Sequence, residues 1–321
     1  MSVLVLAEHS NGAFKKKSLE AVQYAADVAK AQGTTATAIV LGDAPDGAEL
    51  GAYGAQKVLA VKDARLNDFS ARAVAKAVIA AAQKESAKVI ILSHDVMGRQ
   101  IAPRVAARLG AGLVAGAISV PESGGFKLRK SVFAGKAFAD VEVKSEVKVI
   151  TLMPNTFPVK KGEGSAATEA LDVAFDDKDF GVKVKSTNKV TGTVPLSEAE
   201  LVVSGGRGMK GPENWAPLED LAASLGATLA CSRPVADAHW RPHHEHVGQT
   251  GGTIRPNLYI AVGISGAIQH LAGVNASKTI VVINKDAEAP FFKAADYGVL
   301  GDAAEILPKL TAAVKKFKDS H

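Results

Sequence analysis

The chain has 321 residues, of which 47% are hydrophobic and 22% are charged, which is typical of a globular protein long enough for two domains. Its formal charge of +5 arises from basic residues interspersed with acidic ones, so we expect a lysine-rich surface and no nucleic-acid partner. The single cysteine, Cys231, excludes an intrachain disulfide, and no run of about 18 apolar residues indicates a membrane-spanning helix. We therefore expect a cytoplasmic protein without membrane insertion.

The first half of the chain alternates short apolar strands with amphipathic helices. The run Val89-Ile90-Ile91-Leu92 is continuously apolar, as expected of a parallel strand that is buried on both faces. Alternation of this kind predicts an α/β fold with a doubly wound, mainly parallel sheet. In chain order we predict a strand at 3–6, a helix at 15–32, strands at 37–41 and 57–61, a helix at 68–86 capped by Asp68 or Ser70, a strand at 89–92 and a helix at 102–109.

The pattern changes between residues 113 and 200. Three strand patterns, at 113–120, 126–133 and 142–152, follow one another without helices, which predicts antiparallel additions at the edge of the sheet. The stretch 160–200 is polar and poor in long apolar residues, so we expect a connector with one or two exposed strands. The domain boundary is predicted near Val190, giving an N-terminal α/β domain at 1–190 and a second domain at 191–321.

The alternation of strands and helices restarts after residue 200. The stretch 233–256 has neither a helical nor a strand period, and a loop of that length inside a compact domain is usually functional. Predicted elements are strands at 200–204, 227–231, 258–262 and 279–283, a helix at 214–225 that ends at Gly226, and a helix at 303–317.

Glycine-punctuated segments follow or flank the apolar runs of this second half. The carboxyl ends of parallel strands form the crevice in which open α/β sheets bind ligands. Glycines there allow backbone N–H groups to approach a phosphate closely. Three such segments within about a hundred residues predict a Rossmann-like domain that binds a dinucleotide: Ser204-Gly205-Gly206-Arg207-Gly208, Val247-Gly248-Gln249-Thr250-Gly251 and Val262-Gly263-Ile264-Ser265-Gly266.

The segment Gly206-Arg207-Gly208-Met209-Lys210-Gly211 matches the G-x-G-x-x-G pattern in its expected place after a strand. An NAD site would have an acidic residue at the end of the next strand, but that strand ends in Cys231-Ser232-Arg233. An arginine at this position could instead contact a 2′-phosphate. An NADP-dependent oxidoreductase that uses Gly206–Gly211 and Arg233 therefore remains an alternative, and so does a nucleotide-binding subunit without a redox role.

A histidine-rich segment precedes the second glycine string. Histidines and a glutamate at this density suggest a metal site, but Pro242 interrupts any helix that could align them. We favour an exposed loop over a ligand crevice and predict no metal ion. The segment comprises His239, His243, His244, Glu245 and His246.

In its glycine-rich strings and the segments beside them, the sequence resembles the α subunit of electron transfer flavoproteins. The order and spacing of the matching strings extend over the whole second half, and the first half matches more loosely at Val5-Leu6-Ala7-Glu8-His9. The strings are Ser204-Gly205-Gly206-Arg207-Gly208, Ser232-Arg233, Val247-Gly248-Gln249-Thr250-Gly251, the run from Leu258 to Gly273 that contains Ser265-Gly266-Ala267-Ile268-Gln269-His270, Ile283-Asn284-Lys285-Asp286, and Ala295-Asp296-Tyr297-Gly298 followed by Gly301-Asp302.

The resemblance implies one FAD in the second domain. It also implies an N-terminal domain that faces a β subunit carrying AMP or a second FAD, so that the chain acts as half of a heterodimer. It implies that Arg233, Thr250 and His270 tune the flavin. The residues expected to bind the cofactor are Arg207, Ser232, Arg233, Val247, Gly248, Gln249, Thr250, Ser265, Gly266, Ala267, Ile268, Gln269, His270, Asn284, Asp302 and Ala303.

The resemblance further implies an electron carrier rather than a stand-alone enzyme. It would take single electrons from flavin dehydrogenases of the acyl-CoA dehydrogenase type, as in fatty acid oxidation. It would pass them through an anionic semiquinone to a membrane quinone oxidoreductase or another acceptor. An α subunit of an electron-bifurcating complex is the alternative within the family. Two positions depart from the family pattern beside the flavin loop: His246 replaces a common glutamine and Gly252 a common lysine.

Overall fold

The computed structural model describes residues 2–122, 125–187 and 194–320. Two compact units divide the chain, Met1–Lys189 (unit 1) and Val190–His321 (unit 2). The boundary expected near Val190 lies outside the described residues. Each unit is an α/β structure with a mainly parallel sheet of its own, which confirms the predicted fold class.

Unit 1 is built on a nine-stranded sheet in the order β11-β5-β4-β1-β6-β10-β7-β8-β9. All neighbouring strands pair in parallel except β8 with β7 and β9 with β8, which pair antiparallel at one edge. The strands are β1 (Ser2–Leu6), β4 (Thr35–Leu41), β5 (Lys57–Val61), β6 (Val89–Ser93), β7 (Gly112–Ala117), β8 (Lys127–Val132), β9 (Ala137–Glu142), β10 (Lys148–Leu152) and β11 (Ala167–Ala170), beside a two-stranded hairpin of β2 (His9–Ser10) and β3 (Ala13–Phe14).

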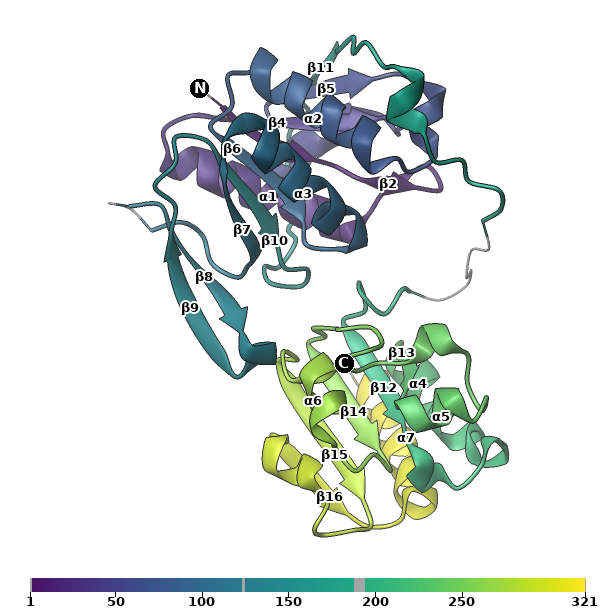
Figure 1. Ribbon diagram of the computed structural model, residues 1–321. Coiled ribbons are helices and arrows are strands. Elements are labelled where there is room, and N and C mark those ends of the chain that lie inside the picture. Colours follow the sequence, from purple (N-terminus) through teal and green to yellow (C-terminus); the bar gives the residue numbers. More distant parts are fainter. Residues whose placement is uncertain (1, 123–124, 188–193, 321) are drawn as a thin grey trace. The chain divides into compact units, whose positions relative to one another are not determined.

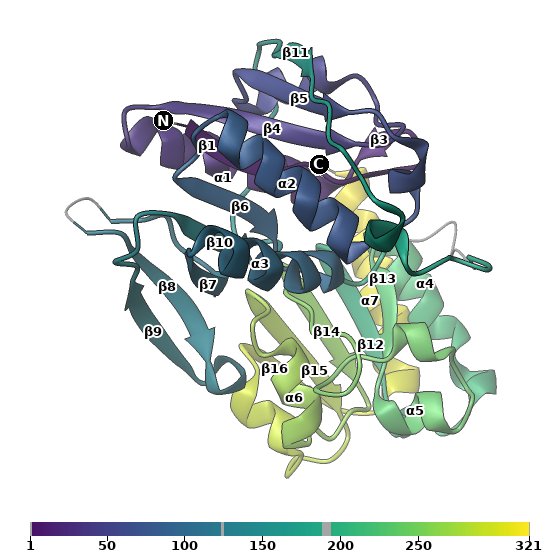
Figure 2. The ribbon, with the colours of Figure 1, turned by 45° about the horizontal axis from the view of Figure 1, so that its top comes forward.

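Helices cover both faces of this sheet (Figures 1 and 2). Val3 and Val5 of β1 pack into the core under α1, whereas Leu4 and Leu6 pack into the core under α2 and α3. This alternation follows from the period of two in a strand. The helices are α1 (Lys16–Ala31), α2 (Ala71–Lys84) and α3 (Val96–Leu109), with 3₁₀ turns η1 (Gly47–Tyr53), η2 (Ala64–Asn67), η3 (Phe133–Gly135) and η4 (Asp177–Phe180).

The expectation of antiparallel additions between residues 113 and 152 is only partly right. Strands β8 and β9 are antiparallel edge strands, but β10 lies inside the sheet and pairs in parallel with both β6 and β7. The predicted strand 142–152 contains β10 but only the last residue of β9, and the residues around Ser145 belong to neither strand; β9 itself was not predicted. Burial explains why this pairing was not predicted. Val149 and Ile150 are fully buried, and a strand buried on both faces has no polar–apolar alternation from which its position in the sheet could be predicted.

Helix α3 begins at Val96, six residues before the predicted start at 102. Asp95 caps it, because its Oδ1 accepts a hydrogen bond from the backbone N–H of Gly98 at 2.7 Å. Pro103 lies inside the helix.

Unit 2 contains a five-stranded, all-parallel sheet in the order β13-β12-β14-β15-β16. The strand order reverses direction between β12 and β14, which is the topological switch point where such sheets bind ligands. The elements are β12 (Leu201–Gly205), α4 (Ala216–Leu225), β13 (Thr228–Cys231), α5 (Arg233–Asp237), β14 (Leu258–Val262), α6 (Ile268–Val274), β15 (Thr279–Asn284), β16 (Tyr297–Leu300) and α7 (Ala303–Asp319), with 3₁₀ turns η5 (Arg207–Met209), η6 (Pro212–Asn214), η7 (His243–Glu245) and η8 (Pro290–Ala294).

Two apolar cores sandwich the sheet of unit 2. Helices α4, α5 and α7 supply the core on one face, with Leu218, Val235 and Leu307. Helix α6 and the turn η8 supply the other, with Val274 and Phe291. Both cores lie under the strands, so the loops at the carboxyl ends of the strands remain available to form a site.

Several details of unit 2 test the predicted elements. Gly226 ends α4 in the left-handed conformation at φ +72°, as expected. The stretch 233–256 is not free of regular structure, because α5 begins at Arg233 with Pro234 in its first turn and η7 follows. The edge strand β16 was not predicted from periodicity, because all four of its residues are exposed and show no alternation.

Within the three described stretches of the chain, no helix has both the length and the hydrophobicity that crossing a bilayer would require.

Candidate functional site

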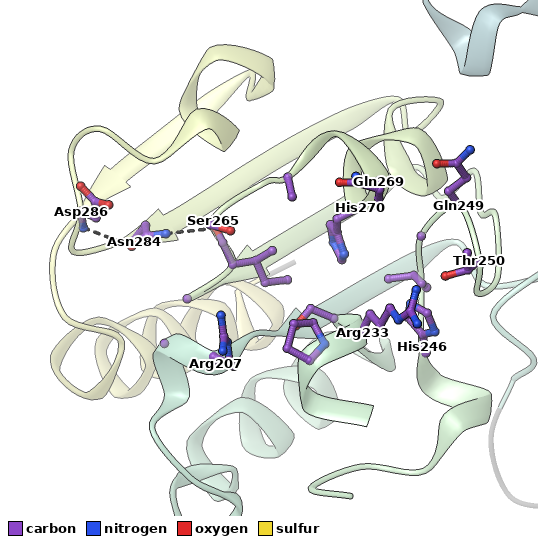
Figure 3. Close-up of a pocket in the computed structure, with 18 residues that line it drawn as sticks. Arg207, Arg233, His246, Gln249, Thr250, Ser265, Gln269, His270, Asn284 and Asp286 are labelled. Carbon is purple, nitrogen blue, oxygen red and sulfur yellow. Dashed lines mark hydrogen bonds between the residues drawn. The ribbon is translucent and has the colours of Figure 1, made fainter. Parts of the chain in front are cut away.

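A cavity of about 470 Å³ opens in unit 2 at the carboxyl ends of β12, β13, β14 and β15 (Figure 3). It therefore lies at the topological switch point of the sheet. Most of the predicted cofactor-binding residues line it, although they come from segments up to 77 positions apart in the sequence, from Arg207 to Asn284. The predicted residues in the lining are Arg207, Ser232, Arg233, Val247, Gly248, Gln249, Thr250, Ser265, Ala267, Gln269, His270 and Asn284.

Four predicted residues do not line the cavity. The side chain of Ile268 is 57% exposed, and Gly266 packs against Phe291. Asp302 accepts a hydrogen bond from the backbone N–H of Ala304 at 2.9 Å and is the N-cap of α7, whose first residue is Ala303. These residues belong to the elements around the cavity and do not line it.

The cavity also has lining residues that were not predicted as ligands. Gly208 belongs to the G-x-G-x-x-G string and Gly263 and Ile264 to the matching run, so the motif itself was a signal for them. His246 also lines the cavity; it was placed in the histidine-rich segment and noted as a departure from the family pattern, but was not predicted as a ligand. Pro234 and Asp286 complete this set.

Two glycine turns meet backbone to backbone at one end of the cavity. A Cβ atom on Gly208 would lie 2.6 Å from the Cα of Gly263, and Gly263 has a left-handed φ of +61°. The N–H of Gly208 donates to the carbonyl of Gly263 at 2.9 Å, and that of Gly206 donates to Val262 at 2.9 Å. Glycine is required here because the turns after β12 and β14 would otherwise be held apart.

The turn that leads from β14 into α6 presents unpartnered donors. Among the described residues, no hydrogen bond uses the backbone N–H groups of residues 265–269. Gly266 supplies a left-handed φ of +82° within this turn. Consecutive free N–H groups form a concave donor surface that suits a phosphate or pyrophosphate.

The polar side chains at the cavity differ in charge. Arg207 and Arg233 are exposed, and the Nε of Arg233 lies 3.3 Å from the Oδ2 of Asp237. His270 is buried, and its Nε2 shares a 2.8 Å hydrogen bond with the hydroxyl of Tyr259. Burial, and secondarily the proximity of His246, lowers the pKa of His270 to about 4. The permanent cations of the site are therefore the arginines, whereas His270 is neutral near pH 7.

Charged hydrogen bonds on the preceding turn hold His246 in position. The guanidinium of Arg241 donates to Glu245 at 2.7 and 2.8 Å and to Glu219 of α4 at 2.6 Å. Glu245 directly precedes His246, so these charged hydrogen bonds hold the loop against α4. Burial lowers the pKa of the His246 imidazole.

The histidine-rich loop contains no metal site in the described residues, because no group of three or more potential ligands converges there. The rings of His239 and His243 pack edge to face, with centroids 6.0 Å apart.

The residues of the cavity fit a flavin dinucleotide. The free N–H groups at 265–269 suit its pyrophosphate, and the exposed ring of Pro234 in the lining offers an apolar surface to a flat ring system. Arg233 supplies a positive charge and Asn284 is fixed, since its Nδ2 donates to the carbonyl of Ile264 at 3.0 Å (Figure 3). A flavin needs this combination of apolar walls and cationic donors.

Comparison with known proteins assigns a family to both halves of the chain. Residues 3–177 match the electron transfer flavoprotein domain, and residues 195–275 match the electron transfer flavoprotein FAD-binding domain. The chain is 40% identical over 271 residues to an electron transfer flavoprotein subunit alpha of Bacillus subtilis, covering 84% of this chain and 83% of that protein.

Two further relatives match almost end to end. An electron transfer flavoprotein subunit alpha of Syntrophomonas wolfei is 37% identical and covers 97% of this chain and 98% of its own length. A protein named FixB of Clostridium saccharobutylicum is 36% identical and covers 98% of this chain and 96% of its own length.

Proposed function

The chain belongs to the electron transfer flavoprotein family as an α subunit. We therefore propose that it binds one FAD in the cavity of unit 2 and carries single electrons between flavoproteins. The observation that carries the proposal is the coincidence of the matched FAD-binding region with a cavity at the switch point of the sheet. Bound FAD would supply one-electron redox chemistry, which no side chain of the cavity provides by itself.

The roles proposed for the lining residues follow from their chemistry. The backbone donors at 265–269 hold the pyrophosphate, and Arg207 at the neighbouring turn adds positive charge. Ser232, Gln249 and Thr250 offer polar groups to the edge of the ring system. Arg233 lines the same cavity, and its guanidinium would favour added negative charge on the bound cofactor.

The buried His270 serves this site as a neutral hydrogen-bonding group. Its ring contacts Phe291 at a centroid distance of 5.8 Å and shares a hydrogen bond with Tyr259, so its position is fixed before any ligand binds. A neutral, pre-oriented imidazole donates or accepts a hydrogen bond without adding charge.

We propose that the physiological partner of the chain is a β subunit that faces unit 1. The relatives are themselves named as alpha subunits, which supports a second chain in the assembly. The hairpin of β8 and β9 carries exposed aromatic side chains, with Phe133 of its turn 80% and Phe138 of β9 61% exposed, and such residues are typical of interfaces. Electron donors would be flavin dehydrogenases such as acyl-CoA dehydrogenases, and the acceptor a quinone oxidoreductase.

The same cavity suits a simple carrier and an α subunit of an electron-bifurcating complex, because the cofactor that separates the two would lie in the β subunit. An NADP-dependent oxidoreductase is the alternative from another class, since Gly208 and Arg233 also line this cavity. A Cβ atom on Gly206 or Gly208 would meet the backbone of Gly263, so these glycines also join two turns of the chain.

The proposal is tested by visible absorption spectroscopy of the purified chain, alone and co-expressed with its β subunit, during stepwise anaerobic reduction. We expect a flavin spectrum that is reduced in two separable one-electron steps. A colourless protein in both preparations, even after addition of FAD, would overturn the proposal. Hydride exchange with NADPH by that colourless protein would establish the alternative.

A further inference from the structure

A second cavity, of about 510 Å³, lies in unit 1 between α2 and α3. The two helices run side by side over the same face of the sheet, as Figures 1 and 2 both show. Its lining carries four basic side chains: Arg72 and Lys76 from α2, and Arg104 and Arg108 from α3. Within each helix the two basic residues are four positions apart, so they lie on one face, one turn from each other. We call this cavity the α2–α3 groove.

The α2 side of the groove is already occupied by an acidic turn of the chain. Asp179 of η4 accepts hydrogen bonds from the Nε of Arg72 at 3.0 Å and the Nζ of Lys76 at 2.7 Å. Asp176 accepts from the same Nζ at 3.1 Å. Asp179 is buried, and the hydroxyl of Ser70 holds its carbonyl at 2.5 Å. The groove thus binds carboxylates of a peptide segment within this structure.

The α3 side has no such counter-charge. Arg104 and Arg108 are both exposed, and neither forms an ion pair or side-chain hydrogen bond with any described residue. Like charges one turn apart disfavour a helix, so this pair does not stabilise α3. With four cations and two carboxylates, the groove keeps an excess positive charge of two on its α3 side.

We propose that Arg104 and Arg108 bind an acidic peptide segment of a partner protein, which lies in the α2–α3 groove beside the acidic turn of this chain. The guanidinium fork matches a carboxylate in a bidentate manner. Two guanidiniums one helical turn apart select a segment with two carboxylates at about 6 Å. The charge complementarity seen at Asp176 and Asp179 is the argument for a peptide as the occupant.

Such a contact would steer association more than it would add affinity, because both guanidiniums are exposed. The inference concerns unit 1 alone and holds whether or not unit 2 carries FAD.

The test uses the full chain and a synthetic helical peptide with glutamate pairs four positions apart, together with its glutamine counterpart and inorganic pyrophosphate as probes. We expect the glutamate peptide to bind, the glutamine peptide not to bind, and the affinity to fall as ionic strength rises. Arg104→Gln and Arg108→Gln should each weaken binding about fivefold.

Arg99→Gln is the matched control, because Arg99 is exposed on the same helix but does not line the groove. Circular dichroism would verify that all three variants are folded. Equal weakening by Arg99→Gln, or no binding of the glutamate peptide to the wild-type chain, would overturn the proposal. So would Arg104-dependent binding of pyrophosphate alone, because the groove would then be a small-anion site.

Discussion

Arg233 is the side chain of the cavity whose charge we expect to govern the redox potential. It stands at the start of α5 and lines the cavity, and its only ion pair among the described residues is the exposed one with Asp237. A charged hydrogen bond of roughly 1.5 kcal/mol corresponds to about 60 mV for a one-electron step, since about 59 mV is about 1.4 kcal/mol. Arg233→Ala should therefore lower the first one-electron potential of bound FAD by about 60 mV, measured by potentiometric titration.

Arg233→Lys is the informative control, because it keeps the charge and loses the planar fork. We expect it to recover most of the potential. An unchanged potential in Arg233→Ala at full FAD occupancy would exclude the role proposed for this residue.

His270 makes the stability of the protein dependent on pH. Burial lowers its pKa in the folded state to about 4, against an ordinary value of 6.5, so the unfolded chain binds more protons between these two values. This contribution to stability is complete above pH 6.5 and is lost as the pH falls toward 4. Between pH 7 and pH 5 the loss is on the order of 1–2 kcal/mol.

The check is chemical denaturation of the wild type and of His270→Gln across this pH range. The variant should have a smaller fall in the free energy of unfolding on acidification, whatever its stability at pH 7. An identical slope in the two proteins would show that folding does not shift the pKa of His270.

Which side chains line the site could be predicted largely from the glycine strings and the family resemblance. The protonation states of these side chains could not be predicted. The sequence places His270 after a run of free N–H groups, but its neutrality depends on Tyr259 and Phe291, which pack against it from elsewhere in the chain. Burial of this kind is a property of the folded unit, so no local pattern reports it.

At the scale of elements, the contact between the turns after β12 and β14 allows a comparison of two glycines with the same backbone conformation. Gly263 has φ +61° and Gly226 has φ +72°, but a Cβ on Gly263 would lie 2.8 Å from the Cα of Gly208, whereas nothing lies within 4 Å of one on Gly226. Both alanine substitutions carry the cost of a left-handed residue, roughly 1 kcal/mol. Only Gly263→Ala adds overpacking, of about 1–3 kcal/mol.

We therefore expect Gly263→Ala to lower the free energy of unfolding more than Gly226→Ala and to weaken FAD binding, which Gly226→Ala leaves intact. Thermal denaturation and titration with FAD measure the two effects. Equal losses in the two variants would mean that the turns can separate without consequence.

Element boundaries were predictable where the chain supplies a local stop signal. Gly226 ends α4 as expected, and the predicted strand 258–262 coincides with β14. The place of β10 between β6 and β7 was not predictable, because pairing partners are chosen by the tertiary fold and not by the periodicity of one strand. For α3, the predicted start at residue 102 was wrong, because Asp95 provides the cap and Pro103 is tolerated inside the helix.

At the scale of the whole molecule, each unit has a sheet and apolar cores of its own, as an independent domain requires. In the described part of the chain, no strand of the five-stranded sheet pairs with the nine-stranded sheet, and each sheet has its own two apolar cores. All residues that line the FAD cavity belong to unit 2. On this ground we propose the domain division expected from the sequence, at 1–190 and 191–321.

The division predicts that a fragment of residues 191–321 folds cooperatively and binds FAD. A fragment that begins at Leu201 keeps every strand but lacks Leu196 and Ala199, which pack in a core, and the carbonyl of Glu200, which accepts from Asn257 at 2.7 Å. We expect it to be less stable by about 2 kcal/mol. Thermal unfolding and flavin absorbance measure both fragments. If the longer fragment were unfolded while the full chain bound FAD, unit 2 would depend on unit 1 for its stability.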